Sequence, residues 1–156
     1  LDNVALAAGL AKTRAPLKAL ALTRRDHERA KARELLKLLG IDDAADSPPA
    51  TLPLGYLKRL ELARALALNP KLLLLDEPLA GLNHMEAKRL ADTVVELNQN
   101  GRTVVLIEHN LGEVMRICSR LVVLDNGRKL GEGDPKEVMA DKEVRAAYLG
   151  ASDAAA

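Results

Sequence analysis

The chain has 156 residues, of which 48% are hydrophobic and 29% are charged, and its formal net charge is +1. This length fits one domain, or one domain with a small additional lobe. No apolar run approaches the roughly 20 residues of a membrane-spanning helix. The small net charge argues against a protein that binds nucleic acid through bulk electrostatics. The sequence opens on Leu1 without a signal peptide, and we expect it to be part of a longer protein.

The first fifty residues predict a small helical lobe without strands. Residues 1–22 favour helix, interrupted at a proline, and a second helix, capped by Thr23 or Asp26, runs to about Leu39. Gly40 ends that helix, because glycine readily adopts the left-handed conformation found after helices. A polar loop with two adjacent prolines follows.

The remainder of the chain alternates strands and helices, which predicts an α/β fold with a mainly parallel sheet and flanking helices. The expected elements, in chain order, are a helix over 57–68, a strand over 72–75, a helix over 84–99, a strand over 103–107, a helix over 110–117, strands over 120–124 and 128–131 joined by the turn 125–127, a helical stretch to about 149, and a flexible tail over 151–156.

The first predicted strand is the stretch that organises the chain, because four leucines lead directly into Asp76, Glu77 and Pro78. In open α/β sheets, ligands bind at the carboxyl ends of the strands. At that edge Asp76 can hold Mg²⁺, directly or through water, while Glu77 orients and deprotonates an attacking water. The alternative is a core strand whose two acids only cap the next turn.

Four motifs follow one another in an order that resembles an ABC-type ATPase. The segment Leu52-Pro53-Leu54-Gly55-Tyr56 resembles the signature motif, and Asp76-Glu77 ends a strand like Walker B. The turn Ala80-Gly81-Leu82-Asn83 resembles the D-loop, and His109 stands after the next strand like the switch histidine. The later stretches AGLNHMEAKRL and LIEHNLGEVMRICSRLVVLDNGRKLGEGDP resemble the ATP-binding subunits of branched-chain amino acid importers.

The resemblance implies roles for these residues, beside simpler structural interpretations. Gly55 would let the backbone at a helix start approach the γ-phosphate of an ATP held by a second subunit, although a plain helix-initiating turn is the alternative. His109 would contact the γ-phosphate, although a lone histidine is often structural. Pro53 and Tyr56 replace the usual serine and glutamine of the signature, and Asn83 replaces the usual aspartate of the D-loop.

The sequence contains no G-x-x-x-x-G-K-S/T loop, which in this family supplies the amides and the lysine that hold the phosphates. We therefore expect a P-loop NTPase-like ABC ATPase fragment. Its parts would be a helical signature subdomain over residues 1–69, the C-terminal half of the ATPase core over 70–150, and the tail.

The resemblance implies an importer subunit at the cytoplasmic face of the membrane that uses ATP and Mg²⁺. Its partners would be a second nucleotide-binding subunit, the permease subunits and, indirectly, a substrate-binding protein, with no nucleic acid. The isolated chain would hydrolyse ATP negligibly, because phosphoryl transfer depends on positioning and charge stabilisation that the missing loop provides. A non-transport ABC ATPase and an interaction module with vestigial motifs are the alternatives.

Overall fold

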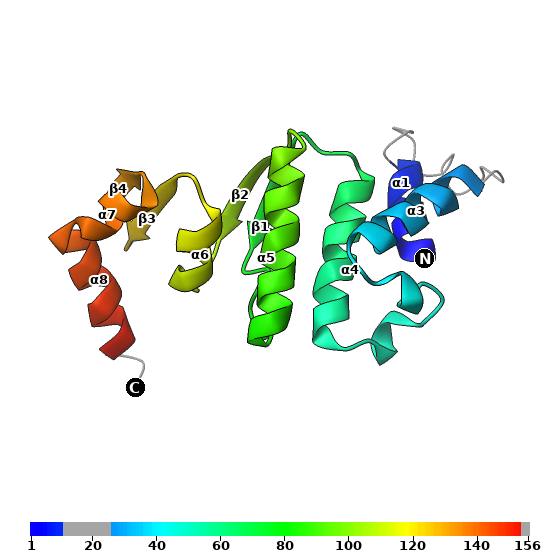
Figure 1. Ribbon diagram of the computed structural model, residues 1–156, viewed down its shortest axis with the longest axis horizontal. Coiled ribbons are helices and arrows are strands. Elements are labelled where there is room, and N and C mark those ends of the chain that lie inside the picture. The colour runs from blue at the N-terminus through cyan, green and yellow to red at the C-terminus, as the bar shows by residue number, and fades with distance from the viewer. Residues whose placement is uncertain (11–25, 154–156) are drawn as a thin grey trace. The chain divides into compact units, whose positions relative to one another are not determined.

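A computed structural model describes residues 1–10 and 26–153 of the chain. It divides into two compact units, Leu1–Glu108 and His109–Ala156. Figure 1 shows the order of the helices and strands along the chain. Among the described residues, no helix is long and apolar enough to cross a membrane.

The first unit opens with a helical part, as the sequence predicts. Helices α1 (Asp2–Leu10), α3 (Asp26–Leu38) and α4 (Leu54–Ala67) pack against one another. The short 3₁₀ helices η1 (Asp42–Ala44) and η2 (Pro49–Thr51) lie in the connection between α3 and α4. The core of this part consists of small and branched apolar side chains: Val4, Ala8, Ala32, Leu36, Leu62, Ala63 and Leu66. The expected helix interruption and the expected cap Thr23 lie outside the described residues, and Asp26, the alternative cap, is the first residue of α3.

The end of α3 confirms the predicted stop at Gly40. This glycine has φ +61°, and its N–H donates to the carbonyl of Lys37 at 3.0 Å. The N–H of Ile41 donates to the carbonyl of Leu36 at 2.9 Å. This pair of reverse hydrogen bonds after the last turn is the usual way to satisfy helix carbonyls beside a left-handed residue.

Helix α4 begins three residues earlier than the sequence predicts, so the predicted start at Leu57 is wrong. The carbonyl of Pro53 accepts hydrogen bonds from the N–H groups of Tyr56 at 3.0 Å and Leu57 at 3.1 Å. Pro53 occupies the N-cap with φ −59°, where its missing N–H costs nothing because the first helical donors lack partners anyway. Gly55 therefore lies inside the first turn of α4, not before it.

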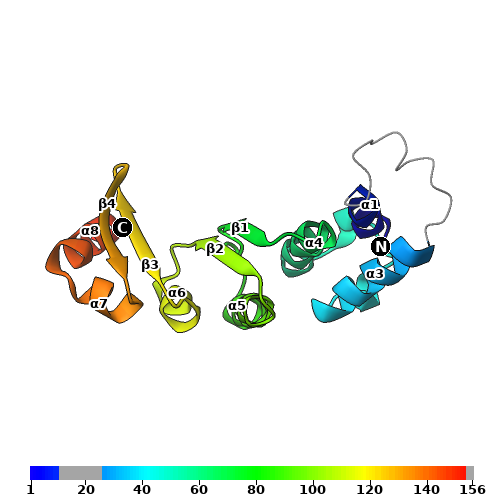
Figure 2. The ribbon, with the colours of Figure 1, turned by 90° about the horizontal axis from the view of Figure 1, so that it is seen from above.

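Strands β1 (Leu72–Asp76) and β2 (Thr103–Ile107) form a parallel pair, with Leu72 opposite Thr103 and Asp76 opposite Ile107. Helix α5 (His84–Gln99) connects them and lies along one face of the pair, as Figure 2 shows. The predicted bounds of α5 and β2 are confirmed. Because the strands are parallel, their carboxyl ends meet at one edge of the pair, as the sequence analysis expected.

The other face of this strand pair is exposed. Leu72, Leu74, Val105 and Ile107 have exposed fractions of 51%, 69%, 48% and 60%, whereas the alternating Leu73 is 4% exposed. Side chains alternate between the two faces of a strand. Both faces of this strand pair are apolar, which is typical of strands that are buried on both sides.

The second unit contains a helix, a hairpin and two terminal helices. These are α6 (Leu111–Ile117), β3 (Leu121–Asp125), β4 (Arg128–Gly133), α7 (Pro135–Ala140) and α8 (Lys142–Asp153). Strands β3 and β4 are antiparallel, and the turn between them has φ +45° at Asn126 and +77° at Gly127, which confirms the predicted hairpin.

The single helical stretch expected at the end of the chain is two helices. Asp141 has an extended ψ of 133° and ends α7. Its carboxylate then accepts the N–H groups of Glu143 and Val144 and so caps α8. Helix α8 continues to Asp153, into the segment expected to be a flexible tail, while residues 154–156 lie outside the described part.

Candidate functional site

The two acids stand at the carboxyl end of β1. Asp76 is the last strand residue, and Glu77 follows it with φ +44°. This left-handed conformation is unfavourable for a residue with a side chain and is commonly found at functional positions. The N–H of Glu77 donates to the carbonyl of Ile107 at 2.9 Å, which attaches the turn to the end of β2. Both acids are exposed.

The turn after Glu77 is held from two sides of the first unit. The carboxylate of Glu108 accepts the N–H of Leu79 at 2.7 Å. The ammonium group of Lys58, on α4, donates to the carbonyl of Glu77 at 3.4 Å. The acid pair is therefore carried by a turn that contacts both β2 and α4, the helix that begins within the signature-like segment.

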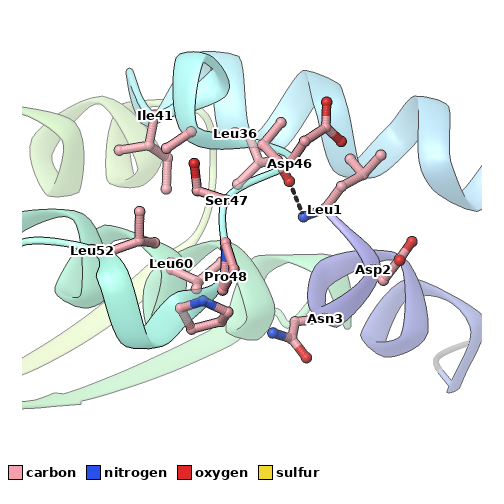
Figure 3. A pocket seen from close by; sticks show the side chains of 13 residues that line it. Leu1, Asp2, Asn3, Leu36, Ile41, Asp46, Ser47, Pro48, Leu52 and Leu60 are labelled. Carbon is pink, nitrogen blue, oxygen red and sulfur yellow. Dashed lines mark hydrogen bonds between the residues drawn. The ribbon is translucent and has the colours of Figure 1, made fainter.

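The first two residues of the signature-like segment have structural positions. Leu52 lines a cavity of about 240 Å³ in the helical part. Figure 3 shows this cavity, with Leu36 and Ile41 among its apolar walls and Asp46 and Ser47 among its polar side chains. Pro53 caps α4 and has no N–H or hydroxyl to offer a phosphate.

Leu54 lies against the turn that precedes α5, and Gly55 lies against the first turn of α5. Gly55 is buried, and a Cβ at this position would lie 2.5 Å from Oε1 of Glu86. A Cβ on Gly81, which has φ +75°, would lie 2.8 Å from a methyl carbon of Leu54. The structure thus brings the signature-like and D-loop-like segments together within the first unit. A side chain at position 55 would have to displace the carboxylate of Glu86.

Tyr56, in the first turn of α4, is hydrogen-bonded to a residue outside this helix. Its hydroxyl donates to a carboxylate oxygen of Asp43 at 2.9 Å, and this hydrogen bond raises the pKa of the Tyr56 phenol. The guanidinium of Arg59 lies 5.0 Å from the centre of the Tyr56 ring and donates to the carbonyl of Gly55 at 2.9 Å. Tyr56 therefore joins the start of α4 to the loop after α3.

Asn83 is the N-cap of α5. Its side-chain oxygen accepts the N–H of Glu86 at 3.0 Å, and a carboxylate oxygen of Glu86 accepts the N–H of Asn83 at 3.2 Å. This reciprocal capping box explains why α5 begins at the predicted residue. Asn83 is exposed, so its side chain combines a local structural role with accessibility.

His109 is the first residue of the second unit and is exposed. Within that unit its carbonyl accepts a hydrogen bond from the hydroxyl of Tyr148, on α8, at 3.4 Å. The interaction concerns the backbone of His109, so the imidazole role expected from the sequence stays a prediction.

Two acidic residues around the site were missed by the sequence analysis, namely Glu86 and Glu108. Glu86 had a detectable signal, because an asparagine followed three residues later by glutamate is the pattern of a capping box. Glu108 had none, because its partner is a backbone N–H 29 residues away in the chain.

The residues present fit a magnesium site in which the protein supplies only one or two of the ligands. Among the described residues, no group of three or more histidine, cysteine, aspartate or glutamate side chains gathers as a metal cage. Mg²⁺ in phosphoryl-transfer sites is typically bound by one or two carboxylates, with substrate phosphates and water supplying the other ligands. The exposed carboxylate of Asp76 at a strand end suits that arrangement.

The parallel strand end with its acid pair, beside a helix that begins at a signature-like segment, is the arrangement that the resemblance to an ABC-type ATPase implies. Two family models match the chain, "ABC transporter" over residues 4–80 and "Branched-chain amino acid ATP-binding cassette transporter" over residues 128–154. The chain belongs to the family of ABC transporter ATP-binding domains.

Curated relatives include proteins of two different transport systems. The lipopolysaccharide export system ATP-binding protein LptB of Haemophilus influenzae is 36% identical over 122 residues, which are 78% of this chain and 51% of LptB. The high-affinity branched-chain amino acid transport ATP-binding protein LivG of Salmonella typhimurium is 39% identical over 121 residues, which are 77% of this chain and 48% of LivG. The chain thus spans about half the length of the curated relatives it matches.

Solved structures support the fold assignment. MJ1267, an ATP-binding cassette of an ABC transporter, matches with a TM-score of 0.78 and 30% identity over 94% of this chain and 61% of its own. CbiO1 from Clostridium perfringens, part of the ABC transporter complex CbiONQ, matches with a TM-score of 0.70 and 35% identity over 82% of this chain and 52% of its own. The α/β ABC ATPase fold expected from the sequence is confirmed.

Proposed function

We propose that this chain forms the signature and Walker B part of the ATP-hydrolysing subunit of an ABC importer for branched-chain or related amino acids. The observation that carries the proposal is Glu77, an exposed carboxylate held in a left-handed turn at the carboxyl end of a parallel strand. In this proposal residues 1–69 are the signature subdomain and residues 70–150 are the C-terminal half of the ATPase core.

Each proposed role uses a property of this chain's own residues. Glu77 accepts a proton from the attacking water and orients it, because its carboxylate stands at the strand end. Asp76 holds Mg²⁺, which when bound neutralises charge on the phosphates. His109 contacts the γ-phosphate through its imidazole.

The start of α4 is the proposed contact for a nucleotide held by a second subunit. The N–H groups of Leu54 and Gly55 begin the helix, where the first donors have no intrahelical acceptor and the helix dipole favours an anion. The carboxylate of Glu86 stands next to Gly55 and opposes an anion there. Asn83 completes the set as a hydrogen-bonding residue at the interface between the two subunits.

The proposed setting is the cytoplasmic face of the membrane, where two subunits bind ATP between them and act on permease subunits. A substrate-binding protein would act indirectly. The amino-acid substrate rests on the family model that matches residues 128–154 and on the similarity to LivG.

The first experiment joins this chain to the N-terminal half of LivG, so that a phosphate-binding loop is present, and measures ATP hydrolysis. We expect Mg²⁺-dependent turnover that Glu77→Gln abolishes, because the amide cannot accept the proton of the attacking water. Turnover that survives in the Glu77→Gln cassette would refute the proposed role of Glu77. As a control, Glu96→Gln changes an exposed glutamate on α5 and should leave turnover unchanged.

A second experiment uses the chain by itself. We expect negligible ATP hydrolysis and no change in melting midpoint with millimolar Mg-ATP, since the principal phosphate donors are absent from the sequence. A ligand present at 100 times its dissociation constant would add about 2.7 kcal/mol to the free energy of unfolding, so binding of that strength is readily detected. A clear shift would contradict this expectation.

Lipopolysaccharide export is the second candidate, because LptB is similar to this chain at 36% identity. Fused cassettes with N-terminal halves from LivG and from LptB can be introduced into strains that lack either protein. Restored uptake of branched-chain amino acids supports the importer proposal. Restored lipopolysaccharide export without amino acid uptake would refute it.

A further inference from the structure

The carboxylate of Glu108 makes one hydrogen bond that reaches the turn carrying Glu77. Oε1 accepts the N–H of Leu79 at 2.7 Å, and Leu79 is 5% exposed. A buried N–H that lost its acceptor would carry the full cost of desolvation. This contact therefore fixes the position of residue 79.

Two successive residues at the end of β2 hold two positions of the same turn. The carbonyl of Ile107 accepts the N–H of Glu77 at 2.9 Å, and the side chain of Glu108 accepts the N–H of Leu79. Between these attachments Glu77 adopts φ +44°, a conformation that persists only when surrounding contacts impose it. Two side chains contribute to that constraint: Glu108 accepts the N–H of Leu79 at 2.7 Å, and the more distant Lys58 donates to the carbonyl of Glu77 at 3.4 Å.

The second oxygen of Glu108 is buried and has no hydrogen-bond partner in the described part of the chain. A buried carboxylate oxygen without a donor is unfavourable, so the negative charge is not what suits Glu108 to this place. What suits Glu108 to this place is the single acceptor oxygen that it directs at the N–H of Leu79. A neutral side chain that retains this acceptor should serve equally well.

We infer that Glu108 is a positioning residue, whose hydrogen bond to the Leu79 N–H holds Glu77 in its left-handed conformation at the end of β1. This inference rests on the proposed function in one respect, namely that Glu77 is the residue that acts on the attacking water. The geometric part concerns the chain alone and is measured without nucleotide.

The test compares Glu108→Leu, which has similar volume and no acceptor, with Glu108→Gln, which retains an acceptor oxygen. Amide hydrogen exchange is followed by NMR in the 156-residue chain. In Glu108→Leu we expect the protection of the Leu79 and Glu77 amides to fall about tenfold or more, the loss expected when a buried donor is left without an acceptor. The amide of Leu90, in the middle of α5, serves as the reference and should not change. Glu108→Gln should keep both amides protected.

The outcomes separate cleanly. Unchanged protection of Glu77 in Glu108→Leu would overturn the inference, and so would a loss in Glu108→Gln as large as in Glu108→Leu. If Glu108→Leu does not fold, Glu108→Asp takes its place, because the shorter side chain cannot reach Leu79. Retained protection in Glu108→Asp would also overturn the inference.

The fused cassette supplies the functional readout. Glu108→Leu should lower kcat for ATP hydrolysis without changing KM, and Glu108→Gln should restore kcat, because the acceptor alone holds Glu77 in place. An equal kcat in Glu108→Leu and the parent cassette would overturn the positioning role. A parent cassette without any turnover would refute the proposed function, while the exchange result on the chain would still decide the geometry.

Discussion

Replacing Glu77 by glycine and by alanine should reverse the usual stability order of these two residues. At ordinary positions glycine is less stable than alanine by about 0.5–1 kcal/mol, because it loses more conformational freedom on folding. At φ +44° alanine carries a left-handed penalty of about 1–2 kcal/mol that glycine does not. Both substitutions remove the same carboxylate, so their difference reports the backbone alone.

The left-handed penalty of alanine exceeds the entropic cost of glycine, so the free energy of unfolding of Glu77→Gly should be about 0.5–1 kcal/mol higher than that of Glu77→Ala. For a chain of this size, 1 kcal/mol corresponds to about 2–4 °C, so the melting midpoints should differ by about 1–4 °C. The backbone hydrogen bond from residue 77 to Ile107 is available in both variants. Thermal unfolding followed by circular dichroism measures the difference.

The control pair is Glu96→Gly and Glu96→Ala, at an exposed glutamate inside α5. Here the alanine variant should be more stable by about 1 kcal/mol, because glycine loses more backbone conformational freedom than alanine when it is fixed in a helix. If alanine equals or exceeds glycine at position 77 as well, the strained turn is not a property of the folded chain and the argument fails. In the fused cassette, both Glu77 variants should lack turnover whichever is more stable.

Three further predictions follow from individual contacts. Asn83→Ala should lower the free energy of unfolding by about 1 kcal/mol, because α5 loses its N-cap acceptor, whereas Asn83→Asp should not; thermal melts compare them. Asp43→Asn should lower the raised pKa of Tyr56 towards its ordinary value, as measured by NMR titration of the ring. The stabilisation from this hydrogen bond is present below the unfolded pKa of about 10 and is lost as the pH rises through the higher folded value. The chain should self-associate through the exposed face that carries Leu74 and Val105, and Leu74→Lys should weaken this; sedimentation velocity that is independent of concentration in the parent chain would contradict it.

The elements that could be predicted are those whose ends are encoded locally. Helix α5 begins at a capping box and ends before Asn100 and Gly101, so both of its bounds follow from a few adjacent residues. The same holds for the hairpin turn at Asn126 and Gly127. In each case the decisive interaction joins residues no more than four positions apart.

Two other helix ends are encoded just as locally, but the sequence analysis did not find them. The early start of α4 depends on Pro53, which occupies the N-cap and whose carbonyl accepts two helical N–H groups. The break between α7 and α8 depends on Asp141, whose side chain caps the second helix. A run of helix-forming residues concealed a residue that competes for backbone hydrogen bonds.

The motifs identified the residues proposed to act on a ligand, but not the residues that hold them. Glu86 stands against Gly55 and accepts a backbone N–H at the start of α5, and Glu108 accepts a backbone N–H beside Glu77. Every residue except proline offers such an N–H, so a distant partner such as that of Glu108 leaves no trace in the sequence, whereas the capping box of Glu86 does. The acids that a motif names are therefore only part of the site. The acids that hold its backbone become visible when the fold brings the two segments together.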